Sequence, residues 1–256
     1  MKGEPSIADL VRRVARIRSS PHDVFRDFCA MSAAAISNAV DPSRREEREA
    51  DYMRIVGKYS PEEAALFPEM LGRVVGELES GHQDVLGKAF MELEIGNKHA
   101  GQFFTPYSLC KAMAAMQVDE SLAAAVRENG FVTLGEPAVG AGGLVIAFAE
   151  AMLAAGMNPQ RQLHVTAQDV DAGAAHMAYV QLSLLGIPAV VVVGDTLRME
   201  TRSVWLTPAH VLGSWGVRLA GRREAVGAPT SPPPTEWSPS PEPADPDQLG
   251  LFGPAP

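Results

Sequence analysis

The sequence has few cysteines, no long apolar run and no excess of positive charge. Cys29 and Cys110 are the two cysteines, and they stand far apart without metal-ligand spacing, so neither a disulfide framework nor a metal site is expected. No run approaches the roughly 18 apolar residues that a membrane span needs. The charged, periodic first residues do not resemble a secretory signal. These absences predict a reduced, cytoplasmic protein.

The formal net charge of −9 argues against a freestanding nucleic-acid-binding protein, which normally shows a basic face. A local basic patch or a basic partner subunit stays open. The 46% of hydrophobic residues suffices for a core, and 256 residues can hold one or two domains.

Residues 1–98 have the pattern of helices. Ser20 and Pro21 predict a capped helix start, because Pro fits the first helical position. The segments Ser43–Glu46 and Ser60–Glu63 both fit a capping box, in which the Ser and Glu side chains satisfy free backbone amides. We interpret this stretch as a helical packing or docking domain.

Residues 99–222 have a different pattern. Apolar runs of strand length occur at 131–137, 162–170 and 189–197, and helical stretches at 143–155 and 172–185 follow the first two. Such alternation indicates a parallel α/β sheet. Residues 223–256 are rich in Pro, Ser and acid, which predicts a disordered tail.

An acidic residue stands near the end of each of the three apolar runs, and a glycine turn follows the first. In open α/β sheets ligands bind outside the carboxyl ends of the strands, where these acids are expected. Pro137 forces an extended conformation on the residue before it, and the glycines allow positive φ and close approach to a ligand. The residues concerned are Glu136, Pro137, Gly140, Gly142, Gly143, Asp169 and Asp195.

The glycine spacing misses the G-x-G-x-x-G of dinucleotide-binding proteins. Two alternatives therefore remain beside a cofactor site of another kind. One is NAD binding, and the other is a purely structural turn. Asp169 suits ribose hydroxyls, and Asp195 can accept a hydrogen bond from an adenine amino group.

Four segments in order, GQFFTP, GEPAVGAGG, AQDVD and GDTL, resemble the adenine-specific (N6) DNA methyltransferases related to modification subunits of type I restriction-modification systems. The resemblance covers roughly residues 80–210. It implies a Rossmann-like methyltransferase sheet, DNA as substrate and S-adenosylmethionine as cofactor. Carried over by motif, the cofactor-binding residues are Phe104, Thr105, Glu136, Pro137, Gly140, Gly142, Asp169 and Asp195.

The GQFFTP segment has its own physical interpretation. Thr105 can cap a helix opened by Pro106, and free amides at a helix start suit a carboxylate. Phe103 or Phe104 can contact adenosine or a sulfonium cation. The alternative is a capped helix with two core phenylalanines.

The resembled family holds the target adenine with an Asn-Pro-Pro-aromatic segment after its fourth strand, and the base is flipped out to reach it. This sequence has no such tetrapeptide. The nearest candidate is the stretch around Thr207 and Pro208, with Thr207 in place of Asn and His210 in place of the aromatic ring. The alternative is that Thr207 and Pro208 only cap a helix.

The sheet of the family has seven strands, and after Trp205 too few residues remain for the last three. We therefore expect the cofactor half of a methyltransferase fold behind a helical domain. The open sheet edge would need cover from the last helix, the front domain or another chain. DNA recognition would need a partner, such as a specificity subunit.

Near the end of the tail, QLGLF resembles the peptide with which bacterial replication and repair proteins bind the DNA sliding clamp. Leu251 and Phe252 would anchor in an apolar pocket, with Gln248 and Leu249 beside them, on a flexible linker. A chance pentapeptide is the alternative.

Two functions thus remain open. The first is a DNA adenine-N6 methyltransferase, or a subunit of one, with Thr207, Pro208 and His210 at the amino group. The second is a catalytically inactive homologue that binds the cofactor and associates with DNA or with the sliding clamp.

Overall fold

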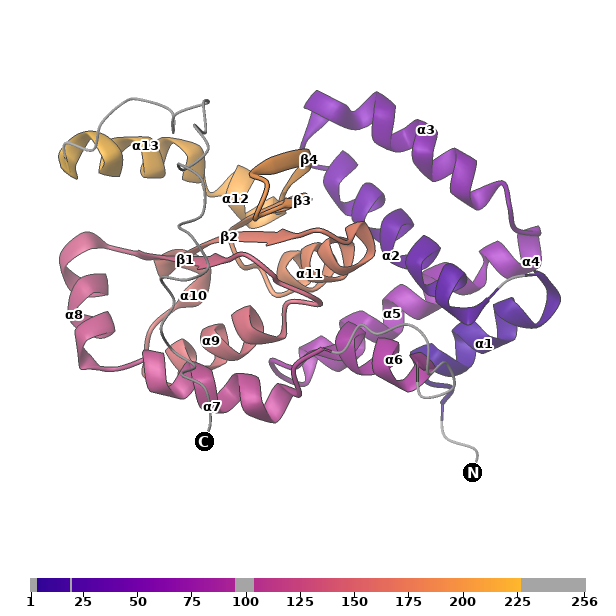
Figure 1. The fold of residues 1–256 in the computed structure, drawn as a ribbon, viewed down its shortest axis with the longest axis horizontal. Helices are drawn as coiled ribbons and strands as arrows, with labels where there is room; N and C mark the ends of the chain where they lie inside the picture. Colours follow the sequence, from indigo (N-terminus) through magenta and orange to yellow (C-terminus); the bar gives the residue numbers. More distant parts are fainter. Residues whose placement is uncertain (1–3, 19, 95–103, 227–256) are drawn as a thin grey trace, which may run out of the picture. The chain divides into compact units, whose positions relative to one another are not determined.

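The computed structural model describes residues 4–18, 20–94 and 104–226. Residues 1–218 form one compact unit and residues 219–256 a second. The first unit is mixed α/β, as the sequence predicts (Figure 1). No described helix is both long and apolar enough to cross a bilayer.

The chain begins with helices, and local capping explains where several of them start. Ser20 accepts a hydrogen bond from the backbone amide of His22 (3.2 Å) with Pro21 in the first turn, and Ser60 with Glu63 forms a capping box, both as predicted. The box predicted at Ser43–Glu46 is wrong. The elements are α1 (Ile7–Arg18), α2 (Pro21–Asn38), η1 (Pro42–Arg44), α3 (Arg45–Val56), α4 (Pro61–Ala64), α5 (Leu66–Glu79) and α6 (Val85–Glu94).

The box at Ser43 fails because a neighbouring acid caps the chain first. Asp41 accepts a hydrogen bond from the backbone amide of Ser43 (3.0 Å) and so caps the short 3-10 helix η1. Helix α3 then starts from Arg44 without a side-chain cap.

A four-stranded sheet follows in the order β1-β2-β3-β4. Strands β1, β2 and β3 are parallel, as the apolar runs predict, and β4 runs antiparallel to β3. The elements are α7 (Tyr107–Gln117), α8 (Glu120–Asn129), β1 (Val132–Glu136), α9 (Gly143–Ala154), α10 (Pro159–Gln162), β2 (Leu163–Asp169), α11 (Ala172–Leu184), β3 (Ala189–Asp195), β4 (Glu200–Leu206), α12 (Pro208–Leu212) and α13 (Trp215–Val226).

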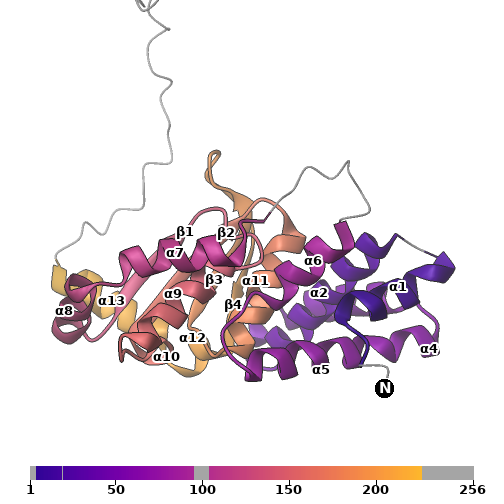
Figure 2. The ribbon, with the colours of Figure 1, turned by 90° about the horizontal axis from the view of Figure 1, so that it is seen from below.

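Helices cover one face of this sheet more fully than the other. Side chains alternate between faces along a strand, and in β2 Val165 and Ala167 are fully buried whereas Thr166 between them is exposed. Helices α7, α9 and α11 lie on the buried side, and Figure 2 views the unit from that side. On the other face, Thr133 and Gly135 of β1 are exposed as well.

The front helices and the sheet share a core. Helix α2 packs against α11, and Arg26 of α2 forms an ion pair with Asp171 at the start of α11 (2.7 Å). At the β4 side, Arg48 of α3 donates to the carbonyl of Val204 (3.3 Å), and its guanidinium lies over the Trp205 ring. The front helices therefore cover one edge of the sheet, which is one of the three covers expected.

Candidate functional site

The turn after β1 is the part of the site that the sequence marks most clearly. Gly140 and Gly142 adopt φ values of +55° and +97°, which only glycine takes up readily, so that α9 can begin at Gly143 directly behind the strand. Glu136 closes the strand, and its carboxylate accepts a hydrogen bond from the backbone amide of Ala138 (3.1 Å). The turn is thus held in one conformation at the carboxyl end of β1.

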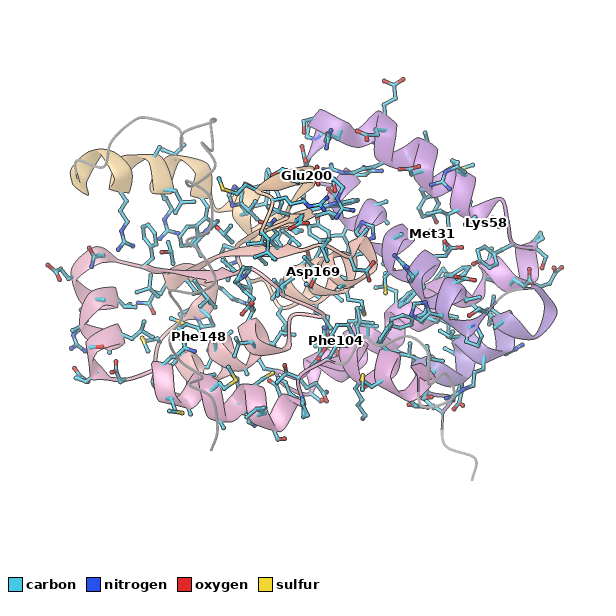
Figure 3. The ribbon with its side chains drawn as sticks, in the orientation of Figure 1. Met31, Lys58, Phe104, Phe148, Asp169 and Glu200 are labelled. Atoms are coloured by element: carbon cyan, nitrogen blue, oxygen red, sulfur yellow. The ribbon has the colours of Figure 1, made fainter. Side chains whose placement is uncertain are left out.

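Asp169 at the end of β2 is joined to this turn. One carboxylate oxygen accepts a hydrogen bond from the Gly140 amide (2.9 Å), and the other accepts one from the Asp171 amide (2.9 Å). The side chain is 8% exposed. The strand-end acids of β1 and β2 therefore lie at one edge, as the parallel arrangement predicts; Figure 3 labels Asp169 there.

Phe104 lies against the same turn. A Cβ added to Gly140 would stand 2.9 Å from the Phe104 ring, so this ring and the backbone meet at closer range than any other residue would allow. The ring also packs on Phe90 of α6, with centroids 4.9 Å apart. Phe104 is therefore a packed ring that also lines the site, and Phe103 lies outside the described residues.

Thr105 needs a correction. It was expected to cap the following helix, but α7 has Pro106 as its N-cap and no side-chain cap hydrogen bond. The reason is local: Pro106 has no amide hydrogen and takes the cap position itself. Thr105 is exposed beside the site, and its carbonyl accepts a weak hydrogen bond from the Cys110 thiol (3.7 Å).

These residues enclose a cavity of about 290 Å³ at the carboxyl edge of the sheet. Four of the residues predicted to hold a cofactor line it, namely Phe104, Thr105, Glu136 and Gly140. Its wall also includes Asp84, Cys110, Met113, Ala138, Val139, Ala141, Gly143 and Leu144. Asp169 is not in the wall but fixes the Gly140 amide from behind.

Asp195 at the end of β3 serves a tight hairpin to β4. Its carboxylate accepts hydrogen bonds from the amides of Leu197 (2.9 Å) and Arg198 (3.1 Å). Thr196 donates to the carbonyl of Pro137 (2.8 Å), so the hairpin is tied to the turn after β1. Asp195 thus lies at the predicted edge, outside the cavity wall, and Figure 2 shows the hairpin projecting beyond the sheet.

The candidates for the adenine amino group lie elsewhere. Because β4 is antiparallel, its last residues pair with the first residues of β3, and the amide of Thr207 donates to Ala189 (3.0 Å). Asp195 lies six residues further along β3, about 20 Å away by the rise of a strand. Thr207, Pro208 and His210 are not among the residues that line the cavity. The structure therefore does not bring Thr207, Pro208 and His210 together with the cavity.

The capping interpretation describes these residues instead. Thr207 is fully buried and caps α12, with Pro208 in the first turn. Its hydroxyl also accepts from the Ala189 amide (2.8 Å) and donates to the Ile187 carbonyl (2.9 Å). His210 forms a buried hydrogen bond with His164 of β2 (2.9 Å), and burial lowers the pKa of both imidazoles.

Asp84 is the wall residue that sequence reasoning missed. Asp84 directly precedes α6, and an acid at the start of a helix usually serves as a cap. Nothing in the local sequence therefore distinguishes Asp84 from an ordinary helix cap. Burial raises the pKa of its carboxyl group, against two hydrogen bonds that lower it. Within residues 4–18, 20–94 and 104–226, no three or more His, Cys, Asp or Glu side chains are grouped to hold a metal ion.

The clamp-peptide residues Gln248, Leu249, Leu251 and Phe252 lie outside the described residues.

Neither a curated protein nor a solved structure matches the chain. A family model does match: the N-6 DNA methylase model covers residues 83–212, which is half of the chain and includes every wall residue of the cavity. On this match and on the partial methyltransferase sheet that accompanies it, the chain belongs to the N-6 DNA methylase family.

Proposed function

We propose that this chain binds S-adenosylmethionine in the cavity at the carboxyl edge of the sheet, and that it is the cofactor-binding part of a DNA adenine-N6 methyltransferase of restriction-modification type. The observation that carries the proposal is the meeting of Phe104, Glu136 and the Gly140 turn around one cavity of about 290 Å³, in a member of the N-6 DNA methylase family.

The cavity suits this cofactor in shape and charge. The Phe104 ring takes up the space that a Cβ at Gly140 would need, so an aromatic face and the bare backbone of the turn lie side by side in the wall, which suits a flat adenosine or a methionine chain. Among the described residues, the wall contains the carboxylates of Asp84 and Glu136 and no Lys, Arg or His. A ligand with positive groups fits such a wall better than a nucleotide phosphate does.

Most of the predicted residues then have a task. Glu136 and the glycine turn hold the cofactor against β1, and Phe104 offers an aromatic face to its cationic centre. Asp169 fixes the Gly140 amide and has lone pairs left for ribose hydroxyls. Asp195 faces the adenine end from β3. When bound, the cofactor supplies an activated methyl group.

The adenine amino group needs hydrogen-bond acceptors at the same edge, because its lone pair is delocalised into the ring. Among the described residues, no Asn-Pro-Pro-aromatic segment stands there, and Thr207 lies at the other end of the sheet. Strand β1 has β2 as its sole strand neighbour within the described sheet. In the doubly wound strand order 3-2-1-4-5-6, the fourth strand lies beside the first. A partner subunit that supplies this strand would bring the acceptors to Glu136.

The second candidate function is cofactor binding without methyl transfer. It is favoured by one specific observation, the antiparallel course of β4, which removes Thr207 and His210 from the cavity. In this case the chain associates with DNA or with the sliding clamp as a binding protein.

Two measurements on the full chain test these functions. Calorimetry with S-adenosylmethionine should give binding that weakens in Asp169→Ala, and no heat from the wild type would reject cofactor binding. Tritium transfer from labelled cofactor to unmethylated DNA then tests catalysis by the chain alone. Incorporation would refute both the second candidate and the need for a partner. The absence of incorporation with intact cofactor binding is expected of both candidates, and incorporation that appears only after a partner subunit is added would support the first.

The QLGLF segment supports a further part of the proposal, namely attachment to the sliding clamp. A polar, Pro-rich stretch precedes two apolar anchors, Leu251 and Phe252, which is the pattern of a tethered hot-spot peptide. A peptide spanning 244–256 should bind purified clamp in fluorescence anisotropy and lose binding on Phe252→Ala. Equal anisotropy curves for the two peptides would remove this part.

A further inference from the structure

The cavity wall contains a carboxylate that no motif assigns, Asp84. It lies in the loop before α6 and is half-buried, with its side chain turned toward the start of α9. A Cβ added to Gly143, the first residue of α9, would stand 3.1 Å from Oδ2 of Asp84. The carboxylate therefore lies directly beside the helix start that closes the glycine turn.

The two oxygens of Asp84 have different surroundings. Oδ1 accepts hydrogen bonds from the Gly87 amide and from Nε2 of Gln181, both at 2.9 Å. In the described part of the chain, no hydrogen bond reaches Oδ2, and this atom is not among the buried unsatisfied ones. Oδ2 is thus an acceptor that is open to the cavity.

Gln181 of α11 holds this carboxylate in place. Its Nε2 atom also donates to the carbonyl of Ala141 in the glycine turn (2.8 Å), and its Oε1 atom accepts from the Leu86 amide (3.1 Å). The side chain is fully buried, so three elements of the site are fixed to one another through one amide group. Such a network preorganises an acceptor and lowers the entropic cost of binding.

The charge of the wall indicates what Oδ2 accepts. Asp84 and Glu136 are the two carboxylates that the described residues contribute, and one oxygen of Glu136 is already engaged by the Ala138 amide. Within residues 20–94 and 104–226, no cationic side chain lines the cavity. A carboxylate facing such a cavity is stabilised by a ligand cation that can donate hydrogen bonds.

We propose that Oδ2 of Asp84 binds the ammonium group of the cofactor's methionine moiety, and that Gln181 is its positioning residue. This inference rests on the proposed function. An ammonium group has three N–H donors, whereas a sulfonium group has none, so the ammonium is the partner that a free carboxylate oxygen selects. Asp84 thereby becomes the residue that discriminates the amino-acid end of the cofactor from a truncated adenosine.

Calorimetry on the full chain with three ligands tests the assignment. S-adenosylmethionine carries both cations, S-adenosylhomocysteine keeps only the ammonium, and 5′-methylthioadenosine has neither the ammonium nor the carboxylate. We expect Asp84→Asn to weaken the first two by about 10- to 100-fold, the range for a lost charge-assisted hydrogen bond. The affinity of the Asp84→Asn variant for 5′-methylthioadenosine should equal that of the wild type. Glu136→Gln is the matched comparison, because it removes the other carboxylate charge of the same described wall.

The other outcomes overturn the proposal. Equal weakening of all three ligands would mean that Asp84 only supports the turn, and weakening of S-adenosylmethionine alone would assign Asp84 to the sulfonium. Unchanged affinities would remove Asp84 from the site altogether.

A measurement without any substitution covers the case of a misfolded variant. The wild type should bind S-adenosylhomocysteine at least about tenfold more tightly than its deaminated analogue, because the analogue cannot form the charge-assisted hydrogen bond with Asp84. Equal affinities would contradict the proposal. If the wild type binds none of these ligands, the proposed function itself fails, which is a different result.

Discussion

The Gly140 amide donates to a carboxylate oxygen of Asp169 over 2.9 Å, and this bond joins the turn after β1 to the end of β2. The second oxygen of Asp169 accepts from the Asp171 amide, so the side chain joins the glycine turn to the connection between β2 and α11. A mostly buried carboxylate with two backbone donors holds the glycine turn after β1 in its conformation.

Asp169→Asn should destabilise the fold and weaken cofactor binding. The new amide nitrogen would face one of two backbone donors, which leaves a buried donor unsatisfied and costs roughly 1–3 kcal/mol. Urea denaturation followed by circular dichroism gives the free energy of unfolding. Asp195→Asn is the control, because that side chain is 27% exposed and water can replace its hydrogen bonds. If both variants lost the same free energy of unfolding, Asp169 would not stabilise the fold more than Asp195 does.

Gly140→Ala should lower both stability and cofactor affinity. The residue has φ +55°, a left-handed conformation that costs an L-residue roughly 1–2 kcal/mol, and the new methyl group would press on the Phe104 ring. Gly135→Ala in the adjoining strand is the matched control, because nothing lies within 4 Å of its added Cβ. Thermal unfolding and calorimetry on both variants check the difference, and a Gly140 variant as stable as the control would disprove it.

Arg48→Ala should destabilise the protein far more than Arg54→Ala. The Arg48 side chain is 6% exposed and pairs with Asp41 at 3.0 Å, so its removal leaves a buried carboxylate without its cationic partner, which costs about 3–5 kcal/mol. Arg54 pairs with Asp51 on the surface, where an ion pair contributes about 0.5 kcal/mol or less. Urea denaturation measures both, and restored stability in Arg48→Met with Asp41→Asn would identify the lone charge as the cause.

Stability should fall in mild acid because of the pair His164 and His210. Burial is the main cause that lowers the pKa of His164, to about 4, and burial also lowers that of His210. The unfolded chain takes up protons below pH 6.5, whereas the folded chain resists until about pH 4, so the free energy of unfolding is highest above pH 6.5 and declines between these values.

Urea denaturation at several pH values between 7 and 4 measures this decline. In His164→Gln the free energy of unfolding should fall less steeply with decreasing pH, because the contribution of the His164 imidazole is gone. Other buried histidines contribute too, notably His176, whose pKa burial lowers to about 4, so part of the slope should remain. An unchanged slope in the variant would show that His164 is protonated equally in both states.

Local signals in the sequence were sufficient to predict the three parallel strands and the two helices that carry the site. The apolar runs became β1, β2 and β3, and the helices expected at 143–155 and 172–185 are α9 and α11. Parallel strands and short connections then place the strand-end acids at one edge.

The direction of β4 could not be predicted in the same way. An apolar run shows that a strand exists and not which way it runs. The hairpin that reverses the chain carries Met199 at φ +55°, where glycine or asparagine would have signalled a tight turn. Without that signal, Thr207 was expected at the wrong edge.

Asp84 was missed for a different reason. Its role depends on Gln181, which lies 97 positions away in the sequence and meets it only after α11 packs against α6. Tertiary contacts of this kind have no counterpart in local spacing, whereas Ser20 and Ser60 act within their own helices and were predictable.

The reversed course of β4 also limits how the sheet can grow. On that side the guanidinium of Arg48 already occupies the carbonyl of Val204, so an incoming strand would first have to displace α3. The outer side of β1 is flanked by no described strand. Any strand that lengthens this sheet from the β1 side must therefore arrive next to Glu136, so that assembly and the completion of the carboxyl edge beside the cavity would be one event.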